Sequence, residues 1–323
     1  MNPDTFRTTF GRIENEVGRV IVGHGEVVRH VLIAVLAGGH ALLEGVPGLG
    51  KTMLIRTLAD VLDLRYSRIQ FTPDLMPADI VGTDILEEAE DGRRDFRFQP
   101  GPIFANLVLA DEINRATPKT QSALLEAMQE RTVTVAQHSY PLAPPFFVLA
   151  TQNPIEMEGT YPLPEAQLDR FLFKIDVRFP AAAELVEILA RTTGAALPPT
   201  EEVADGATLV AMSELARQVP IASHLSDYVA RLVIATHPEG ESAPPMVGRY
   251  VRYGSSPRGG QAMVLGAKIR ALVAGRYNVS FEDVRAIAPA ALRHRLLLNF
   301  EGLAEGVRPD AVIAELLAAV REN

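Results

Sequence analysis

The sequence predicts an α/β fold with a parallel sheet, followed by a smaller all-helical domain. Up to about residue 180, short apolar runs alternate with segments of helical periodicity, which is typical of strand–helix–strand units. A glycine-rich loop at 45–50 joins one apolar run to a helical pattern. Beyond Pro180 the chain is rich in alanine and leucine and has no strand-like run. We therefore expect a first domain over 1–180, then a helical linker and a second domain over 181–323.

Five short runs are the candidate strands of the sheet. A run as apolar as "NLVLAD" belongs inside a sheet rather than on a surface. The five runs cover residues 40–45, 66–72, 106–111, 146–151 and 172–179.

Three segments have helical patterns with identifiable features. Residues 51–64 place Leu54 and Leu58 on one face. In the segment 116–131, Thr117 is the expected N-cap and Pro118 the first helical residue. A third helix, over 279–292, begins with a capping box from Ser280 to Asp283.

Two β-hairpins are expected to interrupt the alternation of strands and helices. The first covers about 82–100, where Asp91-Gly92 is a strong two-residue turn signal. The second covers about 131–142, with its turn at Gln137-His138.

The composition is that of an ordinary soluble protein, with 47% apolar and 22% charged residues. The chain has no cysteine, which fits a reducing cytoplasm and excludes disulfides and thiolate metal sites. The start of the chain does not have the pattern of a signal peptide, and no apolar stretch is long enough to span a bilayer. The net charge of −9 argues against non-specific binding to nucleic acid.

The stretch "EGVPGLGKT" (44–52) has the spacing of a phosphate-binding loop: Gly45, four residues, then Gly50-Lys51-Thr52. It follows a predicted strand and precedes a predicted helix, which is the context that such a loop requires. Glycines allow backbone N–H groups to surround an anion, Lys51 would reach the β- and γ-phosphates, and the Thr52 hydroxyl would ligate Mg²⁺. The alternative is a glycine-rich turn with a surface lysine.

Two adjacent acids, Asp111 and Glu112, stand where the apolar strand 106–111 ends. Two unpaired buried charges are costly, so a cation is expected beside at least one of them. We expect Asp111 to hold Mg²⁺ and Glu112 to activate the attacking water. The alternative is a solvated strand end.

Asn153 follows the strand 146–151 and is a candidate for sensing the terminal phosphate. It would lie beside the attacking water if its strand runs between the phosphate-loop strand and the strand that ends at Asp111. Otherwise Asn153-Pro154 only begins a turn.

Taken together, "GVPGLGKT", "VLADEINRA", "FVLATQNPIE", "GTYPLPEAQLDRF" and "GSSPRGG" resemble the MoxR family of AAA+ ATPases, and the resemblance covers nearly the whole chain. It implies a P-loop AAA+ core built as an αβα sandwich, plus a helical lid domain. Lys51 and Thr52 are similar to the Walker A pair, and Asp111 and Glu112 to the Walker B pair. The first hairpin is similar to the helix-2 insert of this clade, and the second to the hairpin that precedes sensor 1.

The resemblance also assigns roles to three further residues. Asn153 is similar to sensor 1, Arg170 to the arginine finger that reaches a neighbouring subunit's nucleotide, and Arg258 to the sensor 2 arginine carried by the lid. The segment 20–24 corresponds to the adenine pocket. The nucleotide-binding residues so implied are Val22, Gly23, His24, Gly45, Val46, Pro47, Gly48, Leu49, Gly50, Lys51, Thr52 and Met53.

The chain departs from the family pattern at two places. His24 stands where glutamine is expected, and Gly259-Gly260 stands where alanine is usual. Each glycine should weaken the start of the lid helix by roughly 1 kcal/mol and loosen the placement of Arg258.

Arg170 has a physical interpretation that does not depend on the family. A guanidinium can donate two hydrogen bonds to a phosphoryl group, and without the other motifs a surface ion pair with Asp169 or Glu165 would be favoured. Arg115 is a second candidate for a role between subunits.

The resemblance implies Mg-dependent ATP hydrolysis by a homo-oligomer, a hexameric ring, that remodels or matures partner protein complexes. It also implies a partner with a von Willebrand factor A domain, although the sequence does not name the client protein. A nucleic-acid-associated AAA+ motor or loader is the alternative, for which the basic segments 248–260 and 292–298 could be offered; in the latter, Arg293 and Arg295 are interpreted as a solvated helix face. A P-loop kinase for small molecules would leave Asn153 and Arg170 without roles.

Overall fold

The computed structural model describes residues 1–88, 94–154, 159–194 and 199–322. Its centre is a parallel five-stranded sheet with the order β2-β5-β8-β1-β9. All five strands lie within or beside the predicted runs, and β8 lies between β1 and β5, as the interpretation of Asn153 requires. The strands are β1 (Ala41–Glu44), β2 (Tyr66–Gln70), β5 (Leu107–Asp111), β8 (Phe147–Gln152) and β9 (Phe173–Asp176).

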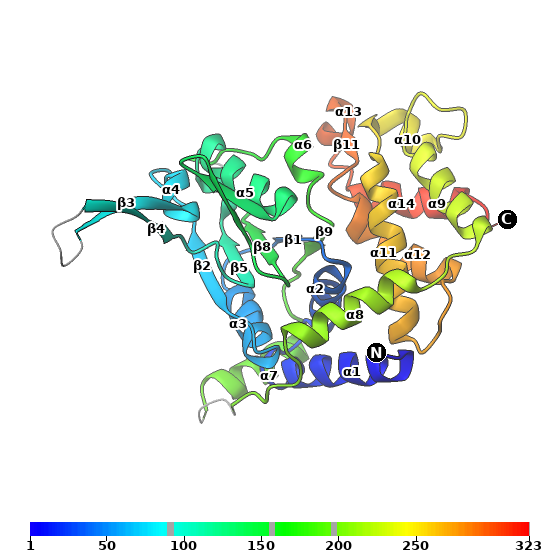
Figure 1. Cartoon of the computed structure of the whole chain (residues 1–323). Coiled ribbons are helices and arrows are strands. Elements are labelled where there is room, and N and C mark those ends of the chain that lie inside the picture. The colour runs from blue at the N-terminus through cyan, green and yellow to red at the C-terminus, as the bar shows by residue number, and fades with distance from the viewer. Residues whose placement is uncertain (89–93, 155–158, 195–198, 323) are drawn as a thin grey trace.

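Helices cover both faces of this sheet and form an αβα sandwich (Figure 1). Side chains alternate between the faces, so Leu107 and Leu109 of β5 join one apolar core while Val108 and Ala110 join the other. The first core contains α1 (Pro3–Val20), α2 (Gly25–Ala37) and α3 (Lys51–Val61). The second contains α4 (Pro77–Val81) and α5 (Pro118–Glu130). Thr117 is the N-cap residue of α5 and Pro118 its first residue, as predicted.

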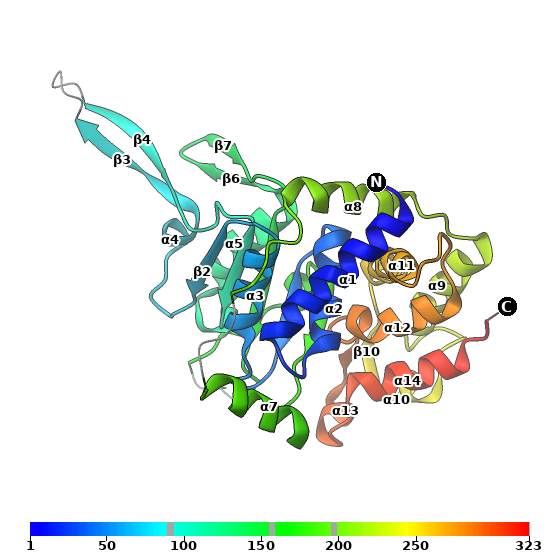
Figure 2. The same ribbon diagram turned by 90° about the horizontal axis from the view of Figure 1, so that it is seen from below.

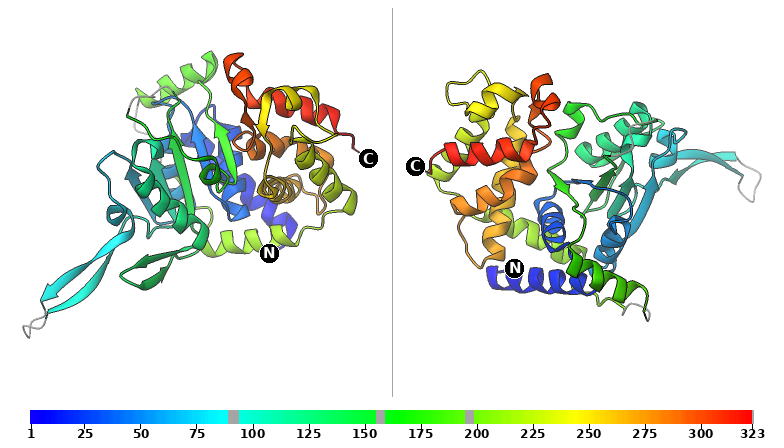
Figure 3. Two further views of the ribbon diagram at one scale, coloured as in Figure 1. Left: turned by 90° about the horizontal axis from the view of Figure 1, so that it is seen from above. Right: turned by 180° about the vertical axis from the view of Figure 1, so that it is seen from behind.

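The C-terminal part is a bundle of helices beside the sheet (Figure 3). A short antiparallel pair, β10 (Val251–Tyr253) and β11 (Leu297–Leu298), lies within it and was not anticipated, because two or three paired residues leave no alternating pattern. The predicted capping box at Ser280 is present. The helices are α8 (Gly206–Gln218), α9 (Ser223–Ala235), α10 (Pro245–Tyr250), α11 (Pro257–Val273), α12 (Phe281–Leu292), α13 (Phe300–Ala304) and α14 (Pro309–Ala319).

The bundle is not separate from the sandwich. One continuous apolar core joins α1, α2 and α3 to α8, α9, α11 and α12. The linker helix α7 (Ala182–Thr192) lies apart from the bundle, near the end of α1 (Figure 2). Two short elements lie between strands of the sheet along the chain. The 3₁₀ turn η1 (Ile113–Arg115) is the next element after β5, and α6 (Glu165–Leu168) is the element before β9.

Both predicted hairpins are present, and the first projects away from the body of the molecule (Figures 1 and 2). It consists of β3 (Gly82–Glu88) and β4 (Arg94–Pro100); its predicted turn, Asp91-Gly92, lies outside the described residues. The second consists of β6 (Thr132–Val135) and β7 (His138–Pro141).

The predicted turn of the second hairpin is wrong by one residue. Val135 pairs with His138, so the turn residues are Ala136 and Gln137, with φ of +45° and +72°. Positive φ at both positions is the geometry that matches the twist of a two-residue hairpin. The sequence hid this turn because neither residue is the glycine, asparagine or aspartate that usually marks it. Among the described residues, no helix is long and apolar enough to cross a membrane.

Candidate functional site

The glycine-rich loop connects the end of β1 to the start of α3. Gly48 and Gly50 adopt φ of +83° and +76°, which side chains disfavour. A Cβ on Gly45 would lie 2.8 Å from the carbonyl oxygen of Val177, so this position has no room for a side chain. Lys51 Nζ donates to the Gly45 carbonyl at 2.6 Å, which closes the loop on itself. The residues of the motif therefore form a compact loop at the N-terminus of a helix.

An apolar pocket of about 230 Å³ lies beside this loop. Its walls come from three separate segments: 20–24, the loop with the first turn of α3, and residues 179–192, which include α7. It thus brings together two groups of residues that the sequence analysis assigned to nucleotide binding. The predicted residues in its lining are Val22, His24, Gly48, Leu49, Gly50 and Met53.

Gly23 and His24 are packed against Glu184 of α7. A Cβ on Gly23 would lie 2.8 Å from the Glu184 carboxylate carbon, and Gly23 has a φ of +75°. Burial lowers the pKa of the His24 imidazole, and the negative charge of Glu184 opposes this effect. His24 is therefore a neutral ring at the edge of the apolar pocket at pH 7.

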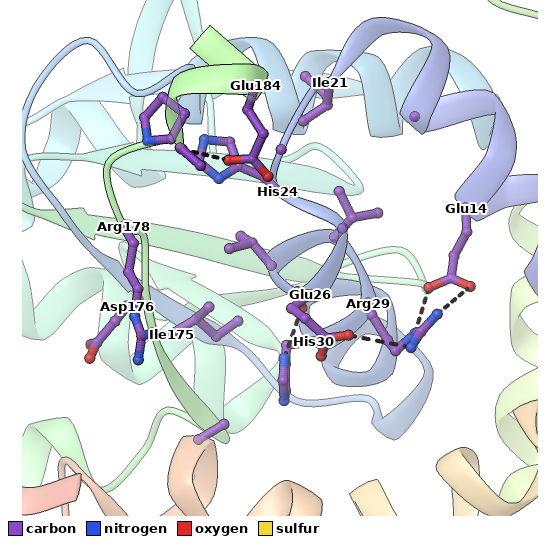
Figure 4. Close-up of a pocket in the computed structure, with 18 of the residues that line it drawn as sticks. Glu14, Ile21, His24, Glu26, Arg29, His30, Ile175, Asp176, Arg178 and Glu184 are labelled. Carbon is purple, nitrogen blue, oxygen red and sulfur yellow. Dashed lines mark hydrogen bonds and ion pairs between the residues drawn. The ribbon is translucent and has the colours of Figure 1, made fainter.

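A larger cleft of about 920 Å³ adjoins this pocket, and Ile21 and His24 line both (Figure 4). It lies between α1, α2, the segment after β9 and α12. Arg29 pairs there with Glu14 at 2.8 Å and with Glu26 at 3.4 Å. The sequence analysis missed this cleft, because its walls come from four segments that share no local pattern.

Asp111 and Glu112 lie at the same edge of the sheet as the loop, because β1, β8 and β5 are adjacent and parallel. Burial lowers the pKa of the Lys51 ammonium, and the carboxylates of Asp111, Glu112 and Glu44 act in the opposite direction. The loop lysine and the two acids therefore form one electrostatic cluster.

Each acid has an arginine partner that the sequence analysis did not identify for it. Arg68 of β2 pairs with Asp111 at 2.7 Å, and Arg115 of η1 pairs with Glu112 at 3.1 Å. Gln70 also donates to Glu112, at 2.9 Å. Arg68 lies in a predicted strand, but only the register of β2 against β5 places it next to Asp111.

Thr151, at the end of β8, connects the two acids. Its hydroxyl donates to Asp111 at 2.7 Å and accepts the Glu112 backbone N–H at 2.8 Å. Glu112 has a φ of +57°, an uncommon conformation for a residue with a side chain. Backbone strain of this kind is frequent at functional sites. Asn153, two residues after Thr151, is only 6% exposed, at the same edge of the sheet.

Arg170 and Arg258 lie together at the opposite edge of the sheet. They line a cavity of about 180 Å³ with Gly39, which precedes β1, and Leu172, which precedes β9. Arg170 donates to the Leu125 carbonyl at 3.0 Å, and Arg258 lies 3.9 Å from the Asp169 carboxylate. The cavity lies before the start of β1, whereas the phosphate loop follows its end. Because β1 has four residues and each residue of a strand advances roughly 3.3 Å, the length of the strand separates the cavity from the loop of the same chain.

The interpretation of Arg293 and Arg295 as a solvated helix face is wrong. Their side chains are only 13% and 2% exposed. Arg293 pairs with Asp310 at 2.9 Å, and Arg295 pairs with Asp169 at 2.8 Å. Helical periodicity could not predict this, because α12 ends at Leu292 and both arginines lie in the irregular chain after it.

The chain is similar to named proteins over almost its whole length. The family described as "ATPase family associated with various cellular activities (AAA)" matches residues 40–173, and the AAA lid domain matches residues 246–316. Chaperone MoxR1 of Mycobacterium tuberculosis is 46% identical over 97% of this chain and 82% of that protein. Protein MoxR of Methylorubrum extorquens is 33% identical over 98% of this chain and 95% of that protein. A solved structure from Cytophaga hutchinsonii, assigned as an ATPase, has a TM-score of 0.92 and 40% identity, and covers 99% of this chain and 96% of that one.

Proposed function

We propose that this chain, which belongs to the MoxR family of AAA+ ATPases, hydrolyses Mg-ATP in a head-to-tail ring and uses the energy to remodel partner protein complexes. One observation carries the proposal. The phosphate loop and acids lie at one edge of the sheet, and Arg170 and Arg258 lie at the other. A site that combines all of them needs two copies of the chain, arranged head to tail.

The residues at the loop edge fit a nucleoside triphosphate. A Cβ on Gly48 would meet nothing within 4 Å, so the loop leaves open space where its backbone N–H groups can face phosphate oxygens. Lys51 now donates to a carbonyl of the loop, and a phosphate would be the stronger acceptor. The adjoining apolar pocket would take the base, with Val22, Gly23 and His24 at its wall.

The oxygen ligands at this edge suit Mg²⁺. Thr52 and Asp111 supply a hydroxyl and a carboxylate, which are hard ligands. A bound Mg²⁺ would neutralise charge on the phosphates. For Asp111 to coordinate it, the pair with Arg68 must open.

Glu112 is the proposed general base. Its carboxylate is oriented by Gln70 and Arg115, and its backbone is held by the Thr151 hydroxyl. A carboxylate so oriented can accept the proton of a water that attacks the terminal phosphate. Asn153, on the adjacent strand end, would orient that water.

We place Arg170 and Arg258 together on the terminal phosphate of a neighbouring copy. Both lie in the cavity beside Gly39, and neither lies beside the loop of its own chain. This arrangement makes the sensor 2 arginine a contribution from the neighbour's lid. An arginine supplied between subunits typically contributes ~10³–10⁵-fold to turnover.

Chaperone-like activity is the family's expected use of this hydrolysis. The curated relative of M. tuberculosis bears the name chaperone. We also propose a hexameric ring, a cytoplasmic location, and a partner with a von Willebrand factor A domain, all from the family resemblance. The alternative of a nucleic-acid motor loses one of its two basic segments, because Arg293 and Arg295 are engaged inside the molecule.

Mixed assemblies test the proposal. Arg170→Ala protomers keep an intact loop, and Lys51→Ala protomers keep intact arginines. Each variant alone should hydrolyse ATP very slowly, and their mixture should regain turnover because each supplies what the other lacks. Wild-type protein mixed with Lys51→Ala is the control for subunit exchange, because the turnover of the mixture should change once inactive protomers enter the wild-type assemblies. No recovery at any ratio, with exchange demonstrated, would contradict the proposal.

A further inference from the structure

The buried side chain of Arg295 holds the loop that carries Arg170. Its Nε donates to the Asp169 carboxylate at 2.8 Å. Its two terminal nitrogens donate to the backbone carbonyls of Asp169 at 3.0 Å, Phe171 at 2.7 Å and Leu172 at 3.1 Å, and to that of Ala291. A guanidinium has five N–H donors, and here each has an acceptor. Four of the five acceptors belong to residues 169–172, so one lid side chain fixes that loop.

The neighbouring residue His294 strengthens this clamp. Its Nε2 lies 3.0 Å from the carbonyl oxygen of Phe171. Burial lowers the pKa of the His294 imidazole well below its usual range, so the ring is neutral. A neutral ring that donates through Nε2 adds a second lid contact to the loop that carries Arg170.

The Asp169 carboxylate connects the same loop to the start of α11. The hydroxyl of Ser256 donates to it at 2.8 and 2.9 Å, and Ser256 is the N-cap residue of α11. Ser256 Oγ also accepts the backbone N–H of Arg258 at 3.2 Å. Asp169 is the residue before Arg170, and it contacts Ser256, which caps the helix that carries Arg258. Asp169 therefore connects the segments that carry the two arginines.

We propose that Arg295 and Asp169 are positioning residues that hold Arg170 and Arg258 at a fixed separation. This rests on the proposed function, in which both arginines act on a neighbour's nucleotide. The two arginines come from segments about 90 residues apart in the chain, and the Asp169 carboxylate links those segments through the Ser256 hydroxyl and through Arg258, which lies 3.9 Å away. Lysine at position 295 would keep the charge but could not reach five acceptors with three donors.

The test is Arg295→Lys, with Arg293→Lys as the matched control. Arg293 is two residues away and is also engaged, with Asp310 at 2.9 and 3.0 Å and the Lys174 carbonyl at 2.8 Å, but it does not hold residues 169–172. Arg295→Lys should lower kcat for ATP at least tenfold and change KM less than threefold, because its own loop and pocket are intact. Arg293→Lys should keep kcat within twofold of wild type.

Mixing then separates positioning from misfolding. Lys51→Ala protomers carry correctly placed arginines, so excess Lys51→Ala should restore turnover to the loops of Arg295→Lys protomers. The inference is overturned if the kcat of Arg295→Lys equals that of Arg293→Lys. It is also overturned if Lys51→Ala restores Arg170→Ala but not Arg295→Lys. If Arg170→Ala is not restored either, the proposed function fails, and this inference fails with it.

A milder variant decides the matter if Arg295→Lys does not fold, as judged by circular dichroism. Ser256→Ala removes the hydroxyl between Asp169 and α11 and leaves the Arg295 pair in place. It should lower kcat at least threefold, and Lys51→Ala protomers should restore the loss. Wild-type kcat, or a loss that is not restored, would overturn the inference.

Discussion

Two adjacent glycines in α11, Gly259 and Gly260, should respond in opposite ways to the same added methyl group. A Cβ on Gly260 would lie 3.4 Å from a methyl of Val233 and 3.5 Å from one of Val229, which are near-ordinary contacts. A Cβ on Gly259 would lie 2.1 Å from the hydroxyl oxygen of Ser255 and 3.0 Å from Leu292. Ser255 is fully buried, so it has little room to move.

The magnitudes follow from these contacts. Replacing glycine by alanine inside a helix contributes about 1 kcal/mol to stability at either position. Gly260→Ala should keep this gain and raise the free energy of unfolding by about 1 kcal/mol. At Gly259 the overlap should cost about 1–3 kcal/mol, as overpacking in a core does. Gly259→Ala should therefore be less stable than Gly260→Ala by about 2 kcal/mol.

Thermal unfolding followed by calorimetry is the assay. For a chain of this size, 1 kcal/mol corresponds to a shift in Tm of roughly 2 °C. Gly260→Ala should melt above wild type and Gly259→Ala below it. Equal stabilisation by both substitutions would refute the close packing at Gly259. It would also favour the sequence-based expectation that both glycines only weaken the start of the helix.

Two further outcomes are expected. Acidification from pH 7 to 5 should lower the free energy of unfolding by about 2 kcal/mol through His40 alone. Burial lowers the pKa of His40 in the folded protein to about 4, whereas in the unfolded chain its pKa is near 6.5. Between these values the unfolded chain binds the proton and the folded protein does not, so the folded state loses stability as the pH falls. Urea unfolding at both pH values should show a smaller pH dependence for His40→Gln, and an equal one would contradict this account. Glu112→Gln should bind ATP as tightly as wild type but hydrolyse it at least 100-fold more slowly, and light scattering should show that it stays assembled in the presence of ATP. Turnover equal to that of wild type would show that Glu112 is not the general base.

The positions of the strands and of the loop along the chain could be predicted because each depends on local pattern, whereas the order of the strands in the sheet came only from the structure. The runs around β1, β5 and β8 are short and apolar, and "GLGKT" directly precedes a helix. Parallel strands place their carboxyl ends at one edge, so the location of Lys51, Asp111 and Asn153 at the same edge follows from topology. The turn at Ala136-Gln137 was misplaced because its residues lack the usual turn chemistry.

The partners of the predicted residues could not be foreseen, because they depend on register and on distant segments. Arg68 meets Asp111 only through the pairing of β2 with β5. Arg295 meets Asp169 across 126 residues of sequence. In isolation, "LRHRLLL" has the appearance of a basic surface segment. Only the fold shows that its second arginine completes a buried clamp.

Each edge of the sheet has an arginine–aspartate pair, Arg68–Asp111 at one and Arg295–Asp169 at the other, but the two arginines differ in burial, and so the pairs differ in how easily they open. Arg68 is 48% exposed, so solvent screens its pair with Asp111, and in the proposed function Mg²⁺ would displace it more easily than it would a fully buried partner. Arg295 is 2% exposed, and separating a buried pair leaves an uncompensated charge that costs about 3–5 kcal/mol. In the proposed function, the nucleotide edge would therefore rearrange when ATP binds, whereas the edge that carries Arg170 would stay fixed. The site that we propose, assembled from two copies, would need this difference, because one side would adapt to the ligand while the other presents its arginines in a fixed position.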